Sequence, residues 1–499
     1  MSGTDPTPFP LDHLAMRGEA DAVALTSGKR VLTYAHLEDE VGRMAGALLA
    51  QGLEAGDRVA SWMGKTDVAC MLPLACARAG LVHVPINPVL KRAQAAHILA
   101  DSGAKLLIGN EARLKSLEAV DRANALALAI EHWSTDVHEA LSPSSQAPDT
   151  LAALMYTSGS TGKPKGVMLS HANLWLGAVS VAHYLGLTSA DRTLAVLPLA
   201  FDYGQNQLFS TWAAGGHVIA LDYLLPRDVI RAIRRLDVSV LAGVPPLWLQ
   251  LVEQDWGDAG TSLRTLTNSG GHLPEPVVRR LRALFPEAHL HLMYGLTEAF
   301  RSTSLDPALV DDHPDSVGTA IPFAEVMVVG LDGEEAAAGE EGELVHAGPL
   351  VGQGYWKDPV KTAERYRPAP SYSEYGGTAV WSGDTVVKST DGLIRFRGRS
   401  DSMIKVSGNR LSPNEIEEAA LASGAASQAL AFGVPDERLG QTILLIATPK
   451  GENPEEKLRA WFARELPAFM MPSRIVWRKE LPLSPNGKLD RSALEKEYA

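Results

Sequence analysis

Apolar and polar positions follow two alternating patterns along the first half of the chain. A stretch with helical spacing, LTYAHLEDEVGRMAGALLAQGL from residue 32, is followed by the short apolar runs DRVASWM (57–63), LVHVPIN (81–87) and AKLLIG (104–109). Similar runs recur as TLAVLPL, HVIALD, VSVLAGV, LRTLTNSGG and AHLHLMYG up to residue 295. Helices that alternate with β-rich runs are typical of βα units in a mostly parallel sheet. We therefore predict a large, multi-sheet α/β domain over residues 1–398.

The pattern changes after about Gly398 to shorter elements, which include QALAFGV, TILLIATP and RIVWRKE. A helix is predicted from Ser412 to about Leu421, because Ser412, Pro413 and Glu415 supply an N-cap, a first-turn proline and a capping-box partner. Residues 399–499 are predicted to form a small α+β domain.

Composition narrows the class of protein. The 499 residues, 45% apolar and 21% charged, are typical of an ordinary globular protein with two or more domains. The N-terminus lacks the pattern of a signal peptide, and no apolar run is long enough to span a membrane. Cys70 and Cys76 lack metal-spaced partners, so buried reduced thiols and a cytoplasmic location are expected. The net charge of −13 disfavours nucleic acid as a partner.

The segment YTSGSTGKPKGVMLSH (156–171) carries the strongest chemical signal. Its glycines let the backbone approach oxyanions, its hydroxyls donate hydrogen bonds, and its lysines supply positive charge, which together suit a polyphosphate. The Walker A pattern fails, because Pro164 stands near the position where that pattern needs Ser or Thr. The candidate phosphate-binding residues are Thr157, Ser158, Gly159, Ser160, Thr161, Gly162, Lys163 and Lys165.

This segment closely resembles the phosphate loop of the adenylate-forming superfamily, which includes acyl-CoA synthetases, peptide-synthetase adenylation domains and luciferases. The resemblance runs from LTYAHL to PNGKLDR near the C-terminus. It implies a large N-terminal domain, a small mobile C-terminal domain, and an active site between them that uses ATP and Mg²⁺.

Further motifs follow in the family's order. SGGHL resembles the adenine-binding turn and YGLTE resembles a segment in which Thr297 contacts phosphate and Glu298 binds Mg²⁺. The residues implied for the nucleotide are Ser269, Gly270, Gly271, Tyr294 and Gly295. WSGDTV places Asp384 where the family binds the ribose, and GRSD places Arg399 where it contacts ribose or phosphate.

The C-terminal part adds the residues implied for the two half-reactions. Asp401 matches the family's hinge, and Lys488 matches the lysine that closes over the site during adenylation. Positive charge is needed there because carboxylate attack on the α-phosphorus brings two anions together. Gly408 matches the glycine that leaves room for a pantetheine arm. Lys405 matches a position used in the second half-reaction, although a surface lysine explains it equally well.

The acid site departs from the common fatty-acid pattern, since PLAFDYGQNQL places Asp202 between Phe201 and Tyr203. Amino-acid adenylation domains also resemble FD at this point. A carboxylate in an apolar pocket needs a partner, which the ammonium group of an amino acid would supply. Alternatively, Asp202 caps a helix or pairs with a protein Arg or Lys. The nearest resemblance is to exosortase-associated AMP-forming acyl-CoA ligases, followed by L-prolyl adenylating ligases that load carrier proteins.

The expected function is therefore an AMP-forming ligase that makes an acyl adenylate and transfers the acyl group to CoA or to the phosphopantetheine of a separate acyl carrier protein. The alternative is an amino-acid adenylating ligase, for example for L-proline, that loads a separate carrier. A luciferase-like oxygenase has no positive support in the sequence. A binding protein on a degenerate fold would predict broken motifs, whereas these motifs are intact.

Overall fold

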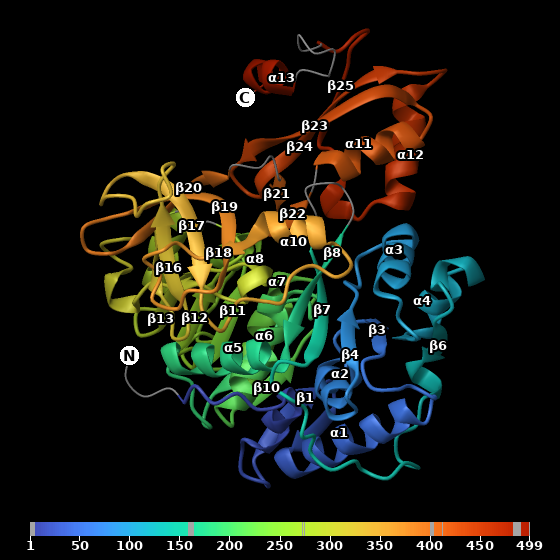
Figure 1. The fold of residues 1–499 in the computed structure, drawn as a ribbon, viewed down its shortest axis with the longest axis vertical. Helices are drawn as coiled ribbons and strands as arrows, with labels where there is room; N and C mark the ends of the chain where they lie inside the picture. Colours follow the sequence, from blue (N-terminus) through green and yellow to red (C-terminus); the bar gives the residue numbers. More distant parts are fainter. Residues whose placement is uncertain are drawn as a thin grey trace.

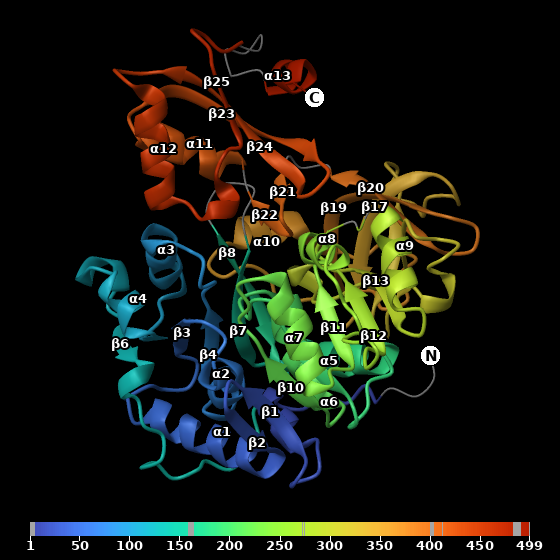
Figure 2. The same cartoon turned by 180° about the vertical axis from the view of Figure 1, so that it is seen from behind.

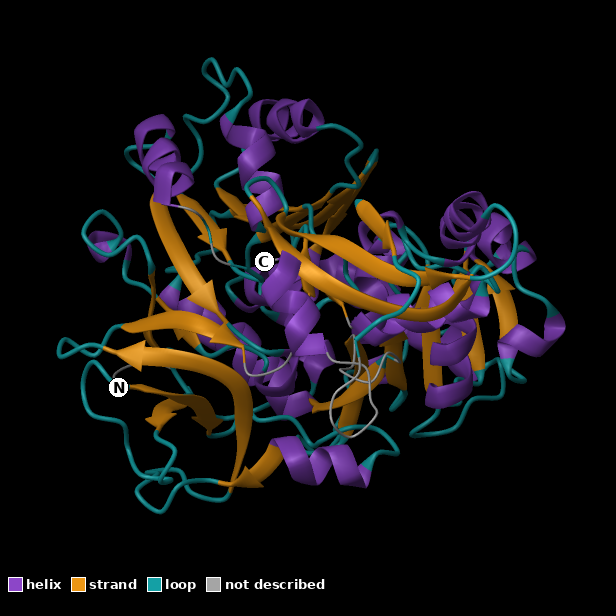
Figure 3. Ribbon diagram, turned by 90° about the horizontal axis from the view of Figure 1, so that it is seen from above, coloured by secondary structure: helices purple, strands orange, loops and turns teal. Residues whose placement is uncertain are grey.

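The computed structural model describes residues 5–157, 164–271, 273, 275–399, 404–411, 413–482 and 491–498. These residues form three sheets, two in a large α/β body and one in a smaller domain at one end of the molecule (Figures 1 and 2). Figure 3 looks onto the molecule from that end and shows groups of strands with helices along their outer sides. This arrangement confirms the predicted fold class.

The first sheet has six strands and is parallel except at its last pair. Its order is β6 (Leu126–Ala129), β5 (Leu106–Gly109), β3 (Arg58–Trp62), β4 (Val82–Pro85), β7 (Leu151–Thr157) and β8 (Lys165–Ser170). The antiparallel β7–β8 hairpin brings the two ends of the expected phosphate loop together, with Thr157 opposite Lys165.

The second sheet has fourteen described strands and joins a parallel half to an antiparallel half. The parallel half is β13 (His289–Tyr294), β12 (Thr265–Asn268), β11 (Val240–Gly243), β9 (Arg192–Ala195), β10 (His217–Ala220) and β1 (Val23–Ser27), with β2 (Arg30–Thr33) antiparallel at its edge. The antiparallel half is β14 (Thr303–Ser304), β15 (Ser316–Ala320), β20 (Ile394–Arg399), β19 (Thr378–Lys388), β17 (Glu341–Ala347), β16 (Glu325–Val329) and β18 (Tyr366–Pro368).

The helices of the large body follow the strands along the chain. They are α1 (Tyr34–Leu49), α2 (Asp67–Arg78), α3 (Arg92–Ser102), α4 (Glu111–Lys115), α5 (His171–Tyr184), α6 (Asp202–Ala213), α7 (Pro226–Leu236), α8 (Pro245–Val252), α9 (Glu275–Leu284) and α10 (Pro359–Arg365). The helical stretch expected from residue 32 begins at Tyr34. Leu32 and Thr33 belong to β2, and the Thr33 side chain accepts a hydrogen bond from the backbone of His36 and so caps the helix.

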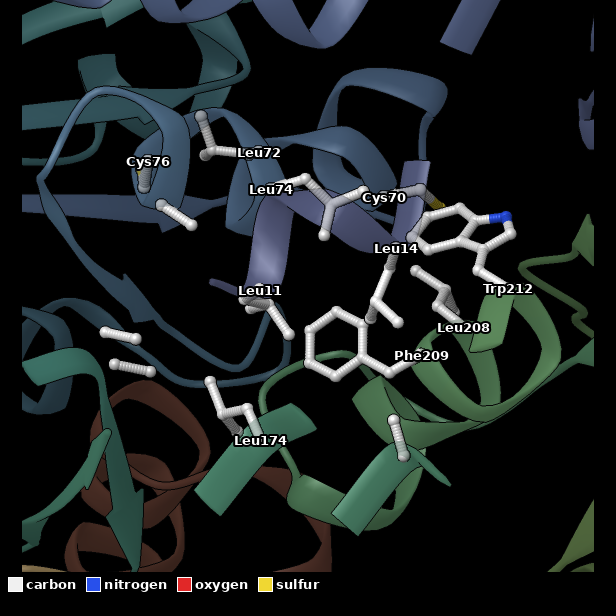
Figure 4. Packing of buried hydrophobic residues seen from close by; sticks show 14 of the residues in the cluster. Leu11, Leu14, Cys70, Leu72, Leu74, Cys76, Leu174, Leu208, Phe209 and Trp212 are labelled. Carbon is white, nitrogen blue, oxygen red and sulfur yellow. The ribbon is translucent and has the colours of Figure 1, made fainter. Parts of the chain in front are cut away.

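A core of buried side chains joins the two sheets of the large body. Leu11 and Leu14 from a 3₁₀ helix (Leu11–Met16) pack between α2, α5 and α6, against residues that include Leu174, Leu208, Phe209 and Trp212 (Figure 4). Cys70 and Cys76 lie in this core as free, buried thiols, as predicted, and burial raises the pKa of Cys70 to about 12. The core fixes α5 and α6, which line the candidate acid cavity described below.

The smaller domain has a sheet and a core of its own. Its strands are β22 (Asn409–Leu411), β21 (Ile404–Val406), β24 (Gly440–Pro449), β23 (Ala426–Asp436) and β25 (Arg474–Trp477), and its helices are α11 (Pro413–Ala422), α12 (Pro454–Glu465) and α13 (Arg491–Tyr498). Ile416, Leu445 and Phe462 are fully buried within it. Helix α11 lies within one residue of the predicted helix, while Ser412 is outside the described residues.

In the described part of the chain, every helix is too short or too polar to cross a bilayer.

Candidate active site

The candidate nucleotide site lies where the two halves of the second sheet meet. Tyr294 ends β13, and its hydroxyl donates a hydrogen bond to Asp384 Oδ2 of β19 over 2.5 Å. Asp384 is 3% exposed and lies opposite Arg399 in the β19–β20 ladder. The structure therefore brings together the YGLTE, WSGD and GR segments, although the Arg399 side chain is outside the described part.

The SGG turn lies next to Tyr294 because it follows β12, the parallel neighbour of β13. Gly270 has a φ of 79°, which glycine adopts without strain. Asn268 Nδ2 donates a hydrogen bond to the Gly271 carbonyl oxygen over 3.1 Å and closes the turn. The side chain of Ser269 is buried and accepts a hydrogen bond from Arg301.

The phosphate side of the site begins at the β7–β8 hairpin. Lys165 lies with its ammonium 5.3 Å from the ring centre of Tyr355, and partial burial lowers its pKa. Residues 158–163 of the expected loop, from Ser158 to Lys163, are outside the described residues.

Glu298 lies in a 3₁₀ turn (Thr297–Ala299) directly after Tyr294 and is 6% exposed. The hydroxyl of Tyr355 donates a hydrogen bond to Glu298 Oε1 over 2.7 Å. Among the described residues, no group of three or more His, Cys, Asp or Glu side chains is arranged to hold a metal ion. One buried carboxylate beside the expected phosphate site still fits Mg²⁺, because this ion usually takes one or two protein carboxylates and completes its shell with phosphate oxygens and water.

Asp202 is the first residue of α6, and its partner is a protein side chain. Arg301 Nη2 lies 3.5 Å from Asp202 Oδ2, and Thr297 Oγ1 donates to Asp202 Oδ1 over 3.3 Å. Burial raises the pKa of Asp202, while the charge of Arg301 acts in the opposite direction. Of the alternatives open from the sequence, pairing with an arginine is the one that the structure contains.

Phe201 and Tyr203, the other two residues expected at the acid site, flank Asp202 in the sequence. Their side chains point to different places. Phe201 is 37% exposed and lines a cleft against the small domain. Tyr203 points inward, and its hydroxyl lies 2.6 Å from Thr267 Oγ1. Gly204 permits this tight helix start, since a Cβ there would lie 1.9 Å from the Pro198 carbonyl oxygen.

Arg301 is a site residue that sequence reasoning missed. It is 2% exposed, and three local features direct it inward. Gly295 leaves room for it, since a Cβ there would lie 3.1 Å from Arg301 Cδ. Phe300 adopts a φ of 56°, and its ring packs where Gly177 has no side chain. An arginine in the apolar context EAFR was the available signal.

Arg301 and Tyr203 line a small cavity in the large body. Its walls come from α5, α6, β9, β11, β12 and β13, so it lies directly beside Thr297 and Ser269. This cavity is the candidate position for the body of the acid substrate.

A second cleft lies between the large body and the small domain. It is lined from the large body by Thr157, Pro164 and Phe201 and from the small domain by Asn409, Leu411 and Glu415. Gly408, at the β21–β22 turn, has a φ of 76°, and a Cβ on it would lie 3.2 Å from Val244 Cβ. Lys405 instead lies with its ammonium 4.7 Å from the ring centre of Phe396. Asp401 and Lys488 are outside the described residues.

The comparisons with known proteins agree with this geometry. The chain matches the family model "AMP-binding enzyme" over residues 12–356 and "AMP-binding enzyme C-terminal domain" over residues 415–488. It is 32% identical over 487 residues to a feruloyl-CoA synthase from Amycolatopsis sp, with 96% of each chain covered. It is 29% identical over 491 residues to an L-proline--[L-prolyl-carrier protein] ligase from Pseudomonas fluorescens, with 95% of this chain and 96% of that protein covered.

Among solved structures, o-succinylbenzoate CoA synthetase from Bacillus subtilis has the same fold at 24% identity, with 98% of each chain covered. The TM-score is 0.87 for a double mutant of that enzyme in complex with the product analogue OSB-NCoA, and 0.73 for the enzyme in complex with the acyl-adenylate intermediate OSB-AMP. The chain belongs to the AMP-binding enzyme family, the adenylate-forming superfamily. It is therefore an acyl-CoA-forming or acyl-adenylate-forming ligase.

Proposed function

We propose that this enzyme joins a carboxylic acid to AMP with release of pyrophosphate, and then transfers the acyl group to a pantetheine thiol of CoA or of a separate acyl carrier protein. The observation that carries the proposal is the YGLTE segment, whose Tyr294 contacts Asp384 while Glu298 is buried three residues after Gly295. The same segment contacts the acid site through Thr297, whose hydroxyl donates a hydrogen bond to Asp202. One continuous segment thus connects the ribose, metal and acid positions.

The nucleotide-binding residues follow from this arrangement. Asp384 accepts hydrogen bonds from the ribose, Tyr294 and the SGG turn flank the adenine, and Thr157, Lys165 and the loop between them bind the phosphates. Arg399 adds a contact to ribose or phosphate. Mg²⁺, held by Glu298, neutralises phosphate charge when bound.

The first half-reaction forms a bond from a carboxylate oxygen of the acid to the α-phosphorus and breaks the bond from that phosphorus to the pyrophosphate oxygen. Lys488 and Thr297 stabilise the developing negative charge. In the second half-reaction the thiol sulfur attacks the acyl carbon, its proton is released, and AMP leaves.

We assign the observed arrangement of the small domain on the large body to the second half-reaction, the transfer of the acyl group to the thiol. The Gly408 turn faces Val244 of the large body, where a Cβ would lie 3.2 Å from Val244 Cβ, and we assign the passage of the pantetheine arm to this point. The TM-score is higher to the product-analogue complex of the double mutant than to the adenylate complex, which supports this assignment. We place the boundary between the domains at residues 398 and 399, and the hinge at Asp401. Lys405 is assigned to the thiol step.

The free buried thiols of Cys70 and Cys76 fit a reducing compartment such as the cytoplasm.

An amino-acid substrate is the second candidate, supported by the prolyl-carrier ligase among the relatives. The Asp202–Arg301 pair weighs against it, because an ammonium group at Asp202 would lie beside a buried cation.

The test is ATP–pyrophosphate exchange with the purified protein against fatty acids, aryl acids and amino acids including proline. Exchange with at least one acid, and loss of exchange in Lys488→Ala with retention of thioester formation from supplied acyl adenylate, supports the proposal. Exchange with none of the acids, or equal loss of both half-reactions in Lys488→Ala, contradicts it.

A further inference from the structure

The acid cavity contains two buried polar groups that the described residues leave without hydrogen-bond partners. Arg301 uses Nη1 to donate to Ser269 Oγ over 3.3 Å, but its Nε and Nη2 make no hydrogen bond to any described residue. Asn206, one helical turn after Asp202 on α6, is 2% exposed, and its Oδ1 likewise has no partner in the described part. Buried polar groups of this kind are normally satisfied, so a ligand is the natural source of the missing partners.

The other polar groups of the cavity wall are already satisfied by the protein. Tyr203 is hydrogen-bonded to Thr267, and Thr211 Oγ1 donates to Thr193 Oγ1 over 2.7 Å. Gln207 accepts a hydrogen bond from the backbone of Leu197. The unmet hydrogen-bonding capacity is thus concentrated at Arg301 and Asn206. The remainder of the wall is largely apolar and includes Val181, Leu185, Leu187, Val240 and Met293.

The charges at this site are balanced. Arg301 is the one permanently charged side chain among the described lining residues, and Asp202 lies 3.5 Å from it. A carboxylate placed here would be repelled by Asp202, and an ammonium group would be repelled by Arg301. A neutral group that both accepts and donates hydrogen bonds is repelled by neither. Its oxygen can accept from Arg301 while its O–H donates to Asn206 Oδ1.

We propose that this pocket selects a compact, amine-free hydroxy acid, whose hydroxyl group is bound between Arg301 and Asn206. The inference rests on the proposed acid-activating function and adds the substrate class to it. Asp202 then acts as a positioning residue that holds Arg301, and Arg301 and Asn206 are the residues that determine specificity.

The experiment measures kcat/KM for ATP–pyrophosphate exchange with matched acids that carry hydrogen, hydroxyl or amine at the same position of one skeleton, in an aliphatic and an aryl series. The wild-type enzyme is expected to prefer the hydroxy acid by about tenfold or more, because a site built for a hydroxyl is left unsatisfied by its absence.

Two variants test whether Asn206 and Arg301 bind the hydroxyl group of the substrate. Asn206→Leu is expected to lower kcat/KM for the hydroxy acid about tenfold and to leave the unsubstituted acid almost unchanged. Arg301→Met removes the cation beside Asp202, so the amine-bearing acid should gain relative to the hydroxy acid. Thermal unfolding verifies that each variant is folded, and Asn206→Ala replaces Asn206→Leu if the larger side chain prevents folding.

The outcomes separate the two proposals. A preference of the wild-type enzyme for the unsubstituted or amine-bearing acid overturns the hydroxy-acid proposal but leaves the ligase function in place. A hydroxy-acid preference that persists unchanged in both variants also overturns it. Absence of exchange with every acid overturns the proposed function itself.

Discussion

The hydroxyl of Tyr294 lies 2.5 Å from Asp384 Oδ2, so the end of β13 holds the carboxylate that we assign to the ribose. Tyr294→Phe retains the ring and removes the bond, and we expect it to raise the KM for ATP about tenfold with a smaller change in kcat. Steady-state exchange at varied ATP concentration measures this. Tyr375→Phe, at an exposed tyrosine, is the matched control. An unchanged KM in Tyr294→Phe would remove Asp384 from the ribose site.

Glu298 is the proposed magnesium ligand, and Tyr355 holds it over 2.7 Å. We expect Glu298→Gln to reduce the exchange rate at least 100-fold and to raise the Mg²⁺ concentration needed for half-maximal rate, because the amide loses the negative charge that a hard cation prefers. Tyr355→Phe should cause a smaller effect in the same direction. The rate is measured against Mg²⁺ concentration at fixed ATP, with exposed Glu287→Gln as the control. A normal Mg²⁺ dependence in Glu298→Gln would contradict the assignment.

Substitution of Gly408, compared with substitution of Gly424, tests the contact between the Gly408 turn and Val244. We expect Gly408→Ala to slow acyl transfer to the thiol at least tenfold and to change exchange less than threefold, because the new Cβ would lie 3.2 Å from Val244 Cβ. Gly424→Ala is the control: Gly424 lies in the same domain with a φ of 69°, but nothing lies within 4 Å of its Cβ position. Both variants carry the backbone strain of a positive φ. Equal losses in the two variants would show that strain, rather than the passage beside Val244, is responsible.

Glu415 lies at the contact between the domains, and we expect it to make this contact dependent on pH. Burial raises its pKa to about 7 from 4.5, and the charge of Glu418 adds to the rise. The hydrogen bond that Gln94 donates to Glu415 over 3.3 Å acts in the opposite direction. The docked state therefore binds more protons than the undocked state between about pH 4.5 and 7. Docking should weaken as pH rises through this window, by roughly 3 kcal/mol at most, and change little above it.

Small-angle X-ray scattering between pH 5 and 8.5 tests this relationship. The wild-type protein should become less compact as pH rises, whereas Glu415→Gln, which stays neutral, should not. Exposed Glu437→Gln is expected to behave like the wild type. A pH response of the same size in Glu415→Gln would mean that another group controls docking.

The sequence was sufficient for the α/β fold class and for the positions of individual strands and helices along the chain. The run AHLHLMYG predicted a strand that ends at Tyr294, and β13 ends there. The capping residues around Pro413 predicted α11 to within one residue. These features depend on local spacing, which a single sequence records directly.

The side-chain pairs that complete the site were not predictable in the same way. Asp202 and Arg301 are 99 positions apart, and Glu298 and Tyr355 are 57 apart. Each pair forms only because α6, the turn after β13 and the segment before α10 pack against one another. The sequence left three alternatives for Asp202: a substrate ammonium group, a helix cap, or a protein Arg or Lys. In the folded chain, tertiary packing places Arg301 beside it.

Among the described residues, all those that line the acid cavity lie between positions 181 and 301, in the large body. Acid selectivity and the movement of the small domain are thus encoded in different parts of the chain. Substitutions confined to the cavity wall leave the proposed hinge at Asp401 unchanged. The same interval also holds Tyr294, Thr297, Glu298 and Val244, which we assign to other steps, so a change of acid is expected from point substitutions in the cavity wall and not from exchange of the whole segment.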